Sequence, residues 1–161
     1  MNRQAITEML EQLNIRYDIM DHPAAYTIED LESFDLPRAD QIAKNLFIRD
    51  DKKRNYYLLT IQKDKMVNLK RLRELISSRA LTFASEEDLA HYLGLTKGAV
   101  SPFGILNDEE RMVHFIIDED LQSLETVGIH PNENTSSIWL AVDDLLGIIK
   151  DHGNTVSAIK I

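Results

Sequence analysis

The chain has 161 residues, of which 43% are hydrophobic and 28% are charged, the composition of an ordinary globular domain. It contains no cysteine, which excludes disulfides, thiolate zinc sites and a cysteine nucleophile, and which fits a reducing compartment. No apolar run approaches the roughly 18 residues of a membrane helix, and the first residues lack the apolar core of a secretory signal, so we expect a cytoplasmic protein that enters no membrane.

The N-terminal part is predicted to contain two helices with a strand between them. Apolar side chains recur at helical spacing over residues 2–14, and a short strand follows from Tyr17. A second helix is expected to begin after Thr27, whose hydroxyl can cap the first free amides while Asp30 completes a capping box. This helix ends before Pro37, because proline disfavours helical geometry in the residue that precedes it.

The rest of the chain alternates between strands, loops and helices. The apolar runs Asn45–Ile48 and Tyr56–Ile61 flank a charged segment, which predicts a hairpin, and the leucine spacing of Leu69–Ile76 predicts a helix with a basic outer face. In chain order the later elements are a strand at Thr82–Phe83, a helix capped by Ser85 and Asp88 and stopped by Gly94, a loop over Gly98–Gly104, a strand over Val113–Ile117, a loop over Gly128–Thr135, a strand over Ile138–Val142, a helix over Asp143–Asp151 and a last strand over Val156–Ile161. Short strands mixed with helices indicate an α/β fold with a mixed sheet, and because neither a repeat nor a linker divides the chain, we expect one domain over residues 1–161.

The net charge of −9 is unevenly distributed along the chain. Residues 44–97 hold 12 basic and 7 acidic side chains, so this middle segment is positive while both flanking segments are acidic. A basic segment can receive a phosphate backbone even in an acidic protein, since the local field matters as well as the total charge. The alternative is that these side chains form a solvated turn and a solvated helix face.

The usual catalytic and metal-binding motifs are not found. The five histidines are widely separated and show no metal-ligand spacing, so we expect no metal; a zinc site assembled from distant positions is the alternative. The sequence contains no G-x-S-x-G elbow, no Walker loop and no G-x-G-x-x-G fingerprint. Standard serine-hydrolase and nucleotide-binding readings therefore lack support.

Three segments remain that could carry chemistry. Lys44 stands immediately before an apolar strand, where its ammonium can reach a phosphate or carbonyl oxygen in a cleft. The segment Gly98–Gly104 is rich in glycine, and glycine lets backbone amides approach a ligand as an oxyanion hole requires. The segment Gly128–Thr135 places His130 before a proline within a polar cluster. Each has a plain alternative: an exposed lysine, a turn and a polar connection.

Taken together and in this order, the three segments resemble the signatures of a known family. Lys44-Asn45-Leu46-Phe47, Gly98-Ala99-Val100-Ser101-Pro102-Phe103-Gly104 and Gly128-Ile129-His130-Pro131-Asn132-Glu133-Asn134-Thr135 are similar to the motifs of the YbaK/prolyl-tRNA-synthetase-associated editing family. The likeness runs over nearly the whole chain. Lys-Asn-Leu-Phe and Gly-x-His-Pro look like the free-standing ProX/PrdX-type branch that acts on Ala-tRNA(Pro), rather than the branch that acts on Cys-tRNA(Pro).

The resemblance implies a fold and an activity. The fold is a mixed, partly barrel-like β-sheet flanked by helices, and the activity is hydrolysis of the ester that joins a wrong amino acid to the tRNA 3′-adenosine, with no metal and no cofactor. Lys44 would hold the phosphate or carbonyl of the terminal nucleotide, amides of Gly98–Ser101 would face the ester, and Gly128–His130 would fix the amino end. His130 is then a positioner, and the substrate's own 2′-hydroxyl helps to activate the water.

The residues implied for this site form two sets. Those for catalysis are Lys44, His130 and Gly98, and those for substrate binding are Asn45, Ala99, Val100, Ser101, Gly128, Ile129 and Asn134. The partner is the acceptor end of a mischarged tRNA(Pro), and a prolyl-tRNA synthetase is a further candidate. The basic side chains expected to contact the acceptor stem are Lys52, Lys53, Arg54, Lys70, Arg71, Arg73 and Arg79.

Several alternatives stay open from sequence. The chain could deacylate Cys-tRNA(Pro) or another aminoacyl-tRNA, or hydrolyse another activated ester. It could also be a binding module that recognises tRNA or a synthetase without catalysis. The presence of both Lys44 and Gly-x-His-Pro favours the enzyme, because a pure binder needs neither. The oligomeric state is not given by sequence.

Overall fold

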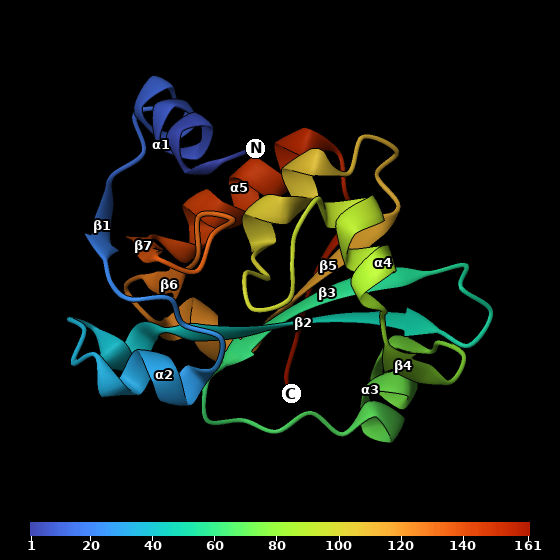
Figure 1. Cartoon of the computed structure of the whole chain (residues 1–161). Coiled ribbons are helices and arrows are strands. Elements are labelled where there is room, and N and C mark those ends of the chain that lie inside the picture. Colours follow the sequence, from blue (N-terminus) through green and yellow to red (C-terminus); the bar gives the residue numbers. More distant parts are fainter.

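The computed structural model describes residues 1–161, and two β-sheets form its centre (Figure 1). The larger sheet has five strands in the order β4-β2-β3-β5-β8, and the smaller has three in the order β1-β7-β6. The strands are β1 (Tyr17–Asp21), β2 (Ala43–Asp50), β3 (Tyr56–Gln62), β4 (Leu81–Phe83), β5 (Val113–Asp118), β6 (Val127–Ile129), β7 (Ser136–Leu140) and β8 (Val156–Ile159).

The larger sheet is mixed, as its sequence pattern predicts. Strands β2 and β3 form an antiparallel hairpin, whereas β3 pairs with β5, and β5 with β8, in parallel. A single parallel bridge between Ile42 and Gly128 connects the two sheets. Strands β4 and β8 remain edges, so the partly barrel-like arrangement goes no further than this bridge and no barrel closes.

Helices cover both faces of the larger sheet. The regular helices are α1 (Arg3–Gln12), α2 (Ile28–Ser33), α3 (Leu69–Ile76), α4 (Glu86–Asp88) and α5 (Val142–His152), and short turns of helix are η1 (Ala39–Gln41), η2 (Leu89–Leu93), η3 (Pro102–Asn107) and η4 (Glu119–Ser123). Both predicted capping boxes, at Thr27 and Ser85, are present. No helix has the length and apolar character needed to cross a membrane.

The hydrophobic core lies in three clusters. The largest cluster fills the space between the two sheets and is covered by α1 and α5. Phe115 and Ile138 are among its fully buried members. A second cluster lies on the opposite face of the larger sheet, where Leu72 of α3 covers the strands. In the third cluster Leu31 of α2 packs with Ile42 and Trp139, and this contact holds α2 beside the beginning of β2.

Several predicted boundaries are wrong: the last strand ends at Ile159 and not at Ile161, the strand predicted over Asn45–Ile48 spans Ala43–Asp50, and three further differences have a clear physical reason. The loop predicted over Gly128–Thr135 begins inside a strand, β6, which has only three residues and is too short for a period-two pattern to reveal. The loop predicted over Gly98–Gly104 ends in a 3-10 turn that begins at Pro102, a residue suited to the first position of a helix. The strand predicted to end at Val142 ends at Leu140, since Val142 already belongs to α5.

Candidate functional site

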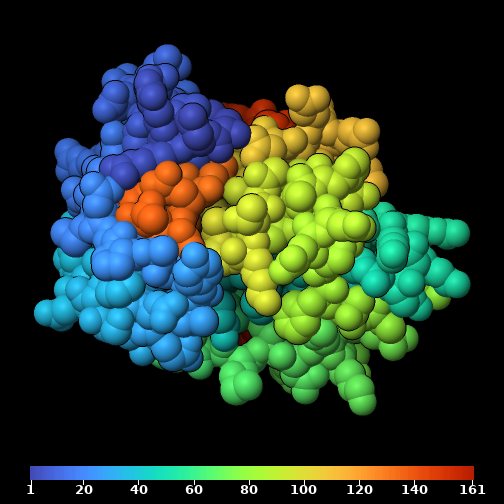
Figure 2. All heavy atoms as spheres, viewed as in Figure 1, coloured from blue at the N-terminus to red at the C-terminus, as the bar shows by residue number.

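A cavity of about 690 Å³ lies where α2 faces the beginning of β2. Five segments form its wall: the residues from Tyr26 to Glu32, the first residues of β2, the loop after β3, the segment around Gly98, and His130 in the loop that follows β6. Its lining residues are Tyr26, Thr27, Ile28, Glu29, Leu31, Glu32, Ala43, Lys44, Asn45, Leu46, Lys63, Asp64, Met66, Gly98, Val100 and His130. The space-filling view shows the orange loop that follows β6 framed by the blue N-terminal segments and the yellow-green segment near residue 100 (Figure 2).

The fold brings five of the predicted site residues together at this cavity: Lys44, Asn45, Gly98, Val100 and His130. They come from three segments that are far apart in the sequence, as the three motifs require. The other predicted residues do not line the cavity, and their contacts are described below.

Lys44 and Asn45 extend from the first residues of β2. The Lys44 ammonium donates a hydrogen bond to the backbone carbonyl of Lys65, with Nζ and oxygen 2.5 Å apart. An ammonium has three protons, so two remain for a ligand. The Asn45 carbonyl oxygen accepts a hydrogen bond of 2.6 Å from the Thr60 hydroxyl, which leaves its NH₂ group as a donor for a ligand.

The segment around Gly98 offers backbone donors. Gly98 has φ of +89°, and a Cβ there would lie 2.8 Å from Cδ1 of Tyr26, so only glycine fits. The amide of Ala99 is used internally, since it donates to the carbonyl of Thr96 at 3.1 Å. The amides of Gly98 and Val100 donate to no other group of the protein. These two amides beside the cavity therefore have no internal acceptor and remain available as donors.

The side chain of Ser101 makes a contact that supports the site. Its side chain is fully buried, and its hydroxyl donates to the backbone carbonyl of His130. The same oxygen accepts the amide of Phe103 at 3.2 Å. Ser101 thus joins the glycine segment to the histidine segment, which fixes the two cavity walls relative to each other.

His130 is arranged to be a neutral acceptor. Its Nδ1 lies 3.0 Å from the carbonyl oxygen of Ser136, and because a carbonyl only accepts, Nδ1 carries the proton. Burial lowers the pKa of His130, and the neighbouring His22 lowers it further, against the opposing effects of Ser136 and Glu133. Near pH 7 its Nε2 therefore has a free lone pair.

Gly128, Ile129 and Asn134 support the site from behind the cavity. A Cβ on Gly128 would lie 2.7 Å from the indole nitrogen of Trp139, so this glycine makes room for the tryptophan. Ile129 is buried in the main core. The backbone carbonyl of Asn134 accepts the amide of Ala25 at 2.9 Å, which ties the loop to the segment before α2.

The seven basic side chains predicted to contact tRNA are exposed and lie at the other end of the hairpin. Lys52, Lys53 and Arg54 form its turn, about 20 Å from Lys44 along β2. Arg79 lies against this turn, because its Nε is 2.6 Å from Oδ1 of Asp51. The other three are on α3, which Figure 1 shows beneath the same end of the sheet.

Sequence reasoning missed the part of the site that α2 and the loop after β3 supply. Lys63 pairs with Glu32 at 3.4 Å and so connects these two walls. Tyr26 and Met66 also line the cavity although 67% and 90% of their surfaces are exposed. The charged run that follows β3 is typical of a plain turn, and the sequence itself offers only the apolar Met66 within that run as a sign of a binding surface.

Comparisons with known proteins identify the family of this chain. The family model described as aminoacyl-tRNA editing domain matches residues 22–148. Prolyl-tRNA editing protein ProX of Acetoanaerobium sticklandii is 45% identical over 159 residues, covering 99% of this chain and 97% of that protein. Prolyl-tRNA synthetase associated domain-containing protein 1 of Bos taurus is 30% identical over 160 residues, covering 94% and 91%.

A solved structure supports the same fold. The crystal structure of a candidate trans-editing enzyme for prolyl tRNA synthetase matches with a TM-score of 0.73 over 99% of this chain and 96% of that chain, at 20% sequence identity. The family inferred from the three motifs is confirmed by the family model and by the relatives. The chain belongs to the aminoacyl-tRNA editing domain family.

Proposed function

We propose that this protein is an aminoacyl-tRNA deacylase that hydrolyses mischarged tRNA(Pro), and that alanine is the residue it removes. The observation that carries the proposal is the meeting of an ammonium, two free amides and a neutral histidine at one cavity. The names of the relatives, a prolyl-tRNA editing protein among them, give the class of substrate.

The chemistry needed is attack of water on an activated ester. The carbonyl oxygen of the ester becomes negative in the tetrahedral intermediate, and the amides of Gly98 and Val100 are the donors for it. Lys44 holds the terminal nucleotide through a phosphate or the carbonyl itself. Because the ester is activated, orientation together with oxyanion stabilisation supplies most of the acceleration, and the substrate's 2′-hydroxyl assists the water.

His130 positions the aminoacyl group. Its neutral Nε2 accepts a hydrogen bond from the substrate's α-ammonium, while its protonated Nδ1 donates to the Ser136 carbonyl and so fixes the ring. The NH₂ group of Asn45 supplies a further donor at the same cavity. In this arrangement His130 does not act as the general base.

The preference for alanine follows from size. A synthetase pocket built for proline excludes alanine poorly, because each missing methylene is worth only about 1–3 kcal/mol, so a second and smaller site is needed. Apolar side chains of Ile28, Leu31 and Val100 line the cavity and suit a methyl group. The proposed subsite for the amino acid is the part of the 690 Å³ cavity beside these three side chains, and it would spare Pro-tRNA(Pro) by admitting a methyl group and not the larger proline ring.

The tRNA is proposed to lie across the basic end of the hairpin. Lys52, Lys53 and Arg54, with Arg79 and the basic face of α3, are exposed there and can follow the phosphates of the acceptor stem. A prolyl-tRNA synthetase is the proposed partner that hands over the mischarged tRNA. We propose that residues 1–161 form a single editing domain that works in the cytoplasm.

The test is deacylation of four substrates, Ala-, Cys-, Ser- and Pro-tRNA(Pro), by the purified protein. We expect the alanyl ester to be hydrolysed fastest and the prolyl ester to be spared. If none of the four esters is hydrolysed, the proposal that the protein is a deacylase is wrong. Rapid hydrolysis of Cys-tRNA(Pro) with little of Ala-tRNA(Pro) overturns the alanine preference and leaves the deacylase in place.

A further inference from the structure

The acceptor that holds the Lys44 ammonium lies in a loop, Lys63–Asn68, that has no helix or strand of its own. Only one backbone hydrogen bond closes its turn, from the amide of Lys65 to the carbonyl of Gln62 at 3.1 Å. Met66, the next residue, is 90% exposed. Side chains therefore contribute to holding this loop in place: Lys63 pairs with Glu32 at 3.4 Å and Val67 packs against the second core cluster. The carbonyl that accepts from Lys44 belongs to Lys65, so the side chain of Lys65 acts on it most directly.

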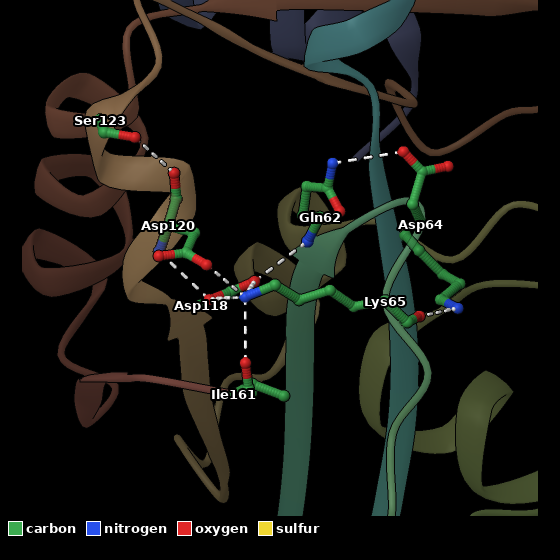
Figure 3. A network of polar contacts seen from close by, with 8 residues as sticks. Gln62, Asp64, Lys65, Asp118, Asp120, Ser123 and Ile161 are labelled. Carbon is green, nitrogen blue, oxygen red and sulfur yellow. Dashed lines mark hydrogen bonds and ion pairs between the residues drawn. The ribbon is translucent and has the colours of Figure 1, made fainter.

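The side chain of Lys65 supplies that fixation. Its ammonium lies 3.0 and 2.9 Å from the two carboxylate oxygens of Asp118, 2.6 Å from Asp120 and 3.0 Å from the carbonyl oxygen of Ile161. Figure 3 shows Lys65 reaching from its loop to these acceptors, which lie at the ends of β5 and β8 and at the start of η4. Lys65 therefore crosses from the cavity loop to the far strands of the larger sheet.

The receiving carboxylate is itself fixed. The side chain of Asp118 is fully buried, and it also accepts the backbone amides of Gln62 at 3.3 Å and of Asp120 at 3.1 Å. Burial acts to lower the pKa of Lys65, but Asp120 and Asp118 raise it above its ordinary value. The ammonium of Lys65 is thus charged throughout the neutral range.

We propose, on the basis of the function above, that Lys65 is a positioning residue for Lys44. Its ammonium is anchored to Asp118 and Asp120, and its backbone carbonyl thereby holds the Lys44 ammonium at a fixed place in the cavity. The two lysines act in series: the buried carboxylate of Asp118 fixes Lys65, and Lys65 in turn fixes Lys44. Without the anchor the long side chain of Lys44 samples many rotamers, and its two remaining protons are not directed at the substrate.

The first test measures how firmly Lys44 is held, without any substrate. Trace labelling of lysine ammonium groups by an amine-reactive ester, read for each lysine by mass spectrometry, is compared in the wild type, Lys65→Met, Lys65→Arg and Asp120→Asn. Loss of one hydrogen bond of ordinary net strength predicts about a fivefold faster labelling of Lys44 in Lys65→Met. We expect a smaller increase in Asp120→Asn, and recovery towards the wild-type rate in Lys65→Arg.

The matched control is Lys150→Met, because Lys150 is an exposed lysine of α5 outside the cavity. Circular dichroism and thermal unfolding show which variants are folded, and Asp120→Asn removes only an exposed partner, so it keeps the test decisive if Lys65→Met does not fold. An unchanged labelling rate of Lys44 in the folded variants overturns the proposal, whether or not the protein proves to be a deacylase.

The second test is a double-mutant cycle on deacylation of Ala-tRNA(Pro). If Lys65 acts through Lys44, Lys65→Met lowers kcat/KM about tenfold in the wild-type background and has no further effect in a Lys44→Ala background. A merely structural role predicts equal losses in both backgrounds, and that result overturns the proposal. Absence of activity in the wild type is a failure of the proposed function alone, and the labelling experiment still decides the role of Lys65.

Discussion

The two ends of the β2–β3 hairpin carry lysines in opposite states. At the first residues of β2, Lys44 is half-buried and its ammonium is held by a carbonyl that is itself anchored. At the turn, Lys52 and Lys53 are exposed and make no ion pair. The same side chain thus provides a directed donor at one end of the ribbon and a mobile positive charge at the other, about 20 Å away. Local fixation, rather than residue type, separates the proposed site for chemistry from the proposed surface for long-range attraction.

The largest effect is expected at the cavity end. Lys44→Ala removes a directed ammonium from the reacting region, so we expect kcat/KM for Ala-tRNA(Pro) to fall about 100-fold, as for loss of a directed donor at a site of this kind. Steady-state deacylation measures it, and Lys150→Ala is the control on an exposed lysine. An equal loss of kcat/KM in Lys44→Ala and Lys150→Ala would show that the fixed lysine at the cavity end is no more important than an exposed one.

Gly128→Ala tests the packing that supports the cavity end of the hairpin. Gly128 forms a β-bridge with Ile42, which lies just before β2. The added Cβ meets the indole of Trp139 at 2.7 Å, so overpacking is expected to lower the free energy of unfolding by about 1–3 kcal/mol. Gly147→Ala is the matched control, because nothing lies within 4 Å of its Cβ and a helical alanine is favoured by about 1 kcal/mol. Urea unfolding of both variants gives the comparison; a stabilised Gly128→Ala variant contradicts it.

The turn of the hairpin is tested by replacing Lys52, Lys53 and Arg54 together with glutamate. Loss of three phosphate contacts is expected to raise KM about tenfold while leaving kcat unchanged, and to flatten the dependence of log KM on log salt concentration. Deacylation assays at several salt concentrations measure both quantities. An unchanged KM at every salt concentration would exclude this turn from the tRNA-binding surface.

The smallest effect concerns protonation at the cavity end. Burial lowers the pKa of His130, so in an NMR titration its ring should take up a proton below pH 6.5, the ordinary value. Since the unfolded chain takes up that proton first, this group reduces the stability of the folded protein as pH falls through 6.5 towards the lower folded value. A His130 pKa at or above 6.5 would contradict the burial argument.

Much of the fold was predictable from sequence because its signals are local. Thr27 and Ser85 precede their helices at capping distance, and the alternation of Val113, Phe115 and Ile117 is the pattern of a strand with one buried face. The three-residue strand β6 was not predictable, since its pairing partner β7 lies on the other side of a loop and decides its conformation. The capping and periodicity signals carry no information about which strands pair.

The site was predictable only in part. Lys44, Gly98 and His130 could be named because they belong to motifs, but the roles of Ser101 and Gly128 depend on partners distant in sequence, the His130 carbonyl and the Trp139 indole. Lys65 carries no motif at all. Its importance lies in its backbone carbonyl and in a carboxylate 53 positions later, and neither can be read from the run of charges around it.

The pairing of β1 with β7 has a consequence for how the protein is made. Tyr17 lies opposite Leu140, so the strand that leads into α2 finds its partner only near the end of the chain. A nascent chain on the ribosome can form the β2–β3 hairpin early, because its strands are neighbours in sequence, but it must wait for the last quarter of translation before α2 is placed. The wall of the cavity that α2 forms is therefore placed only after most of the chain has been made.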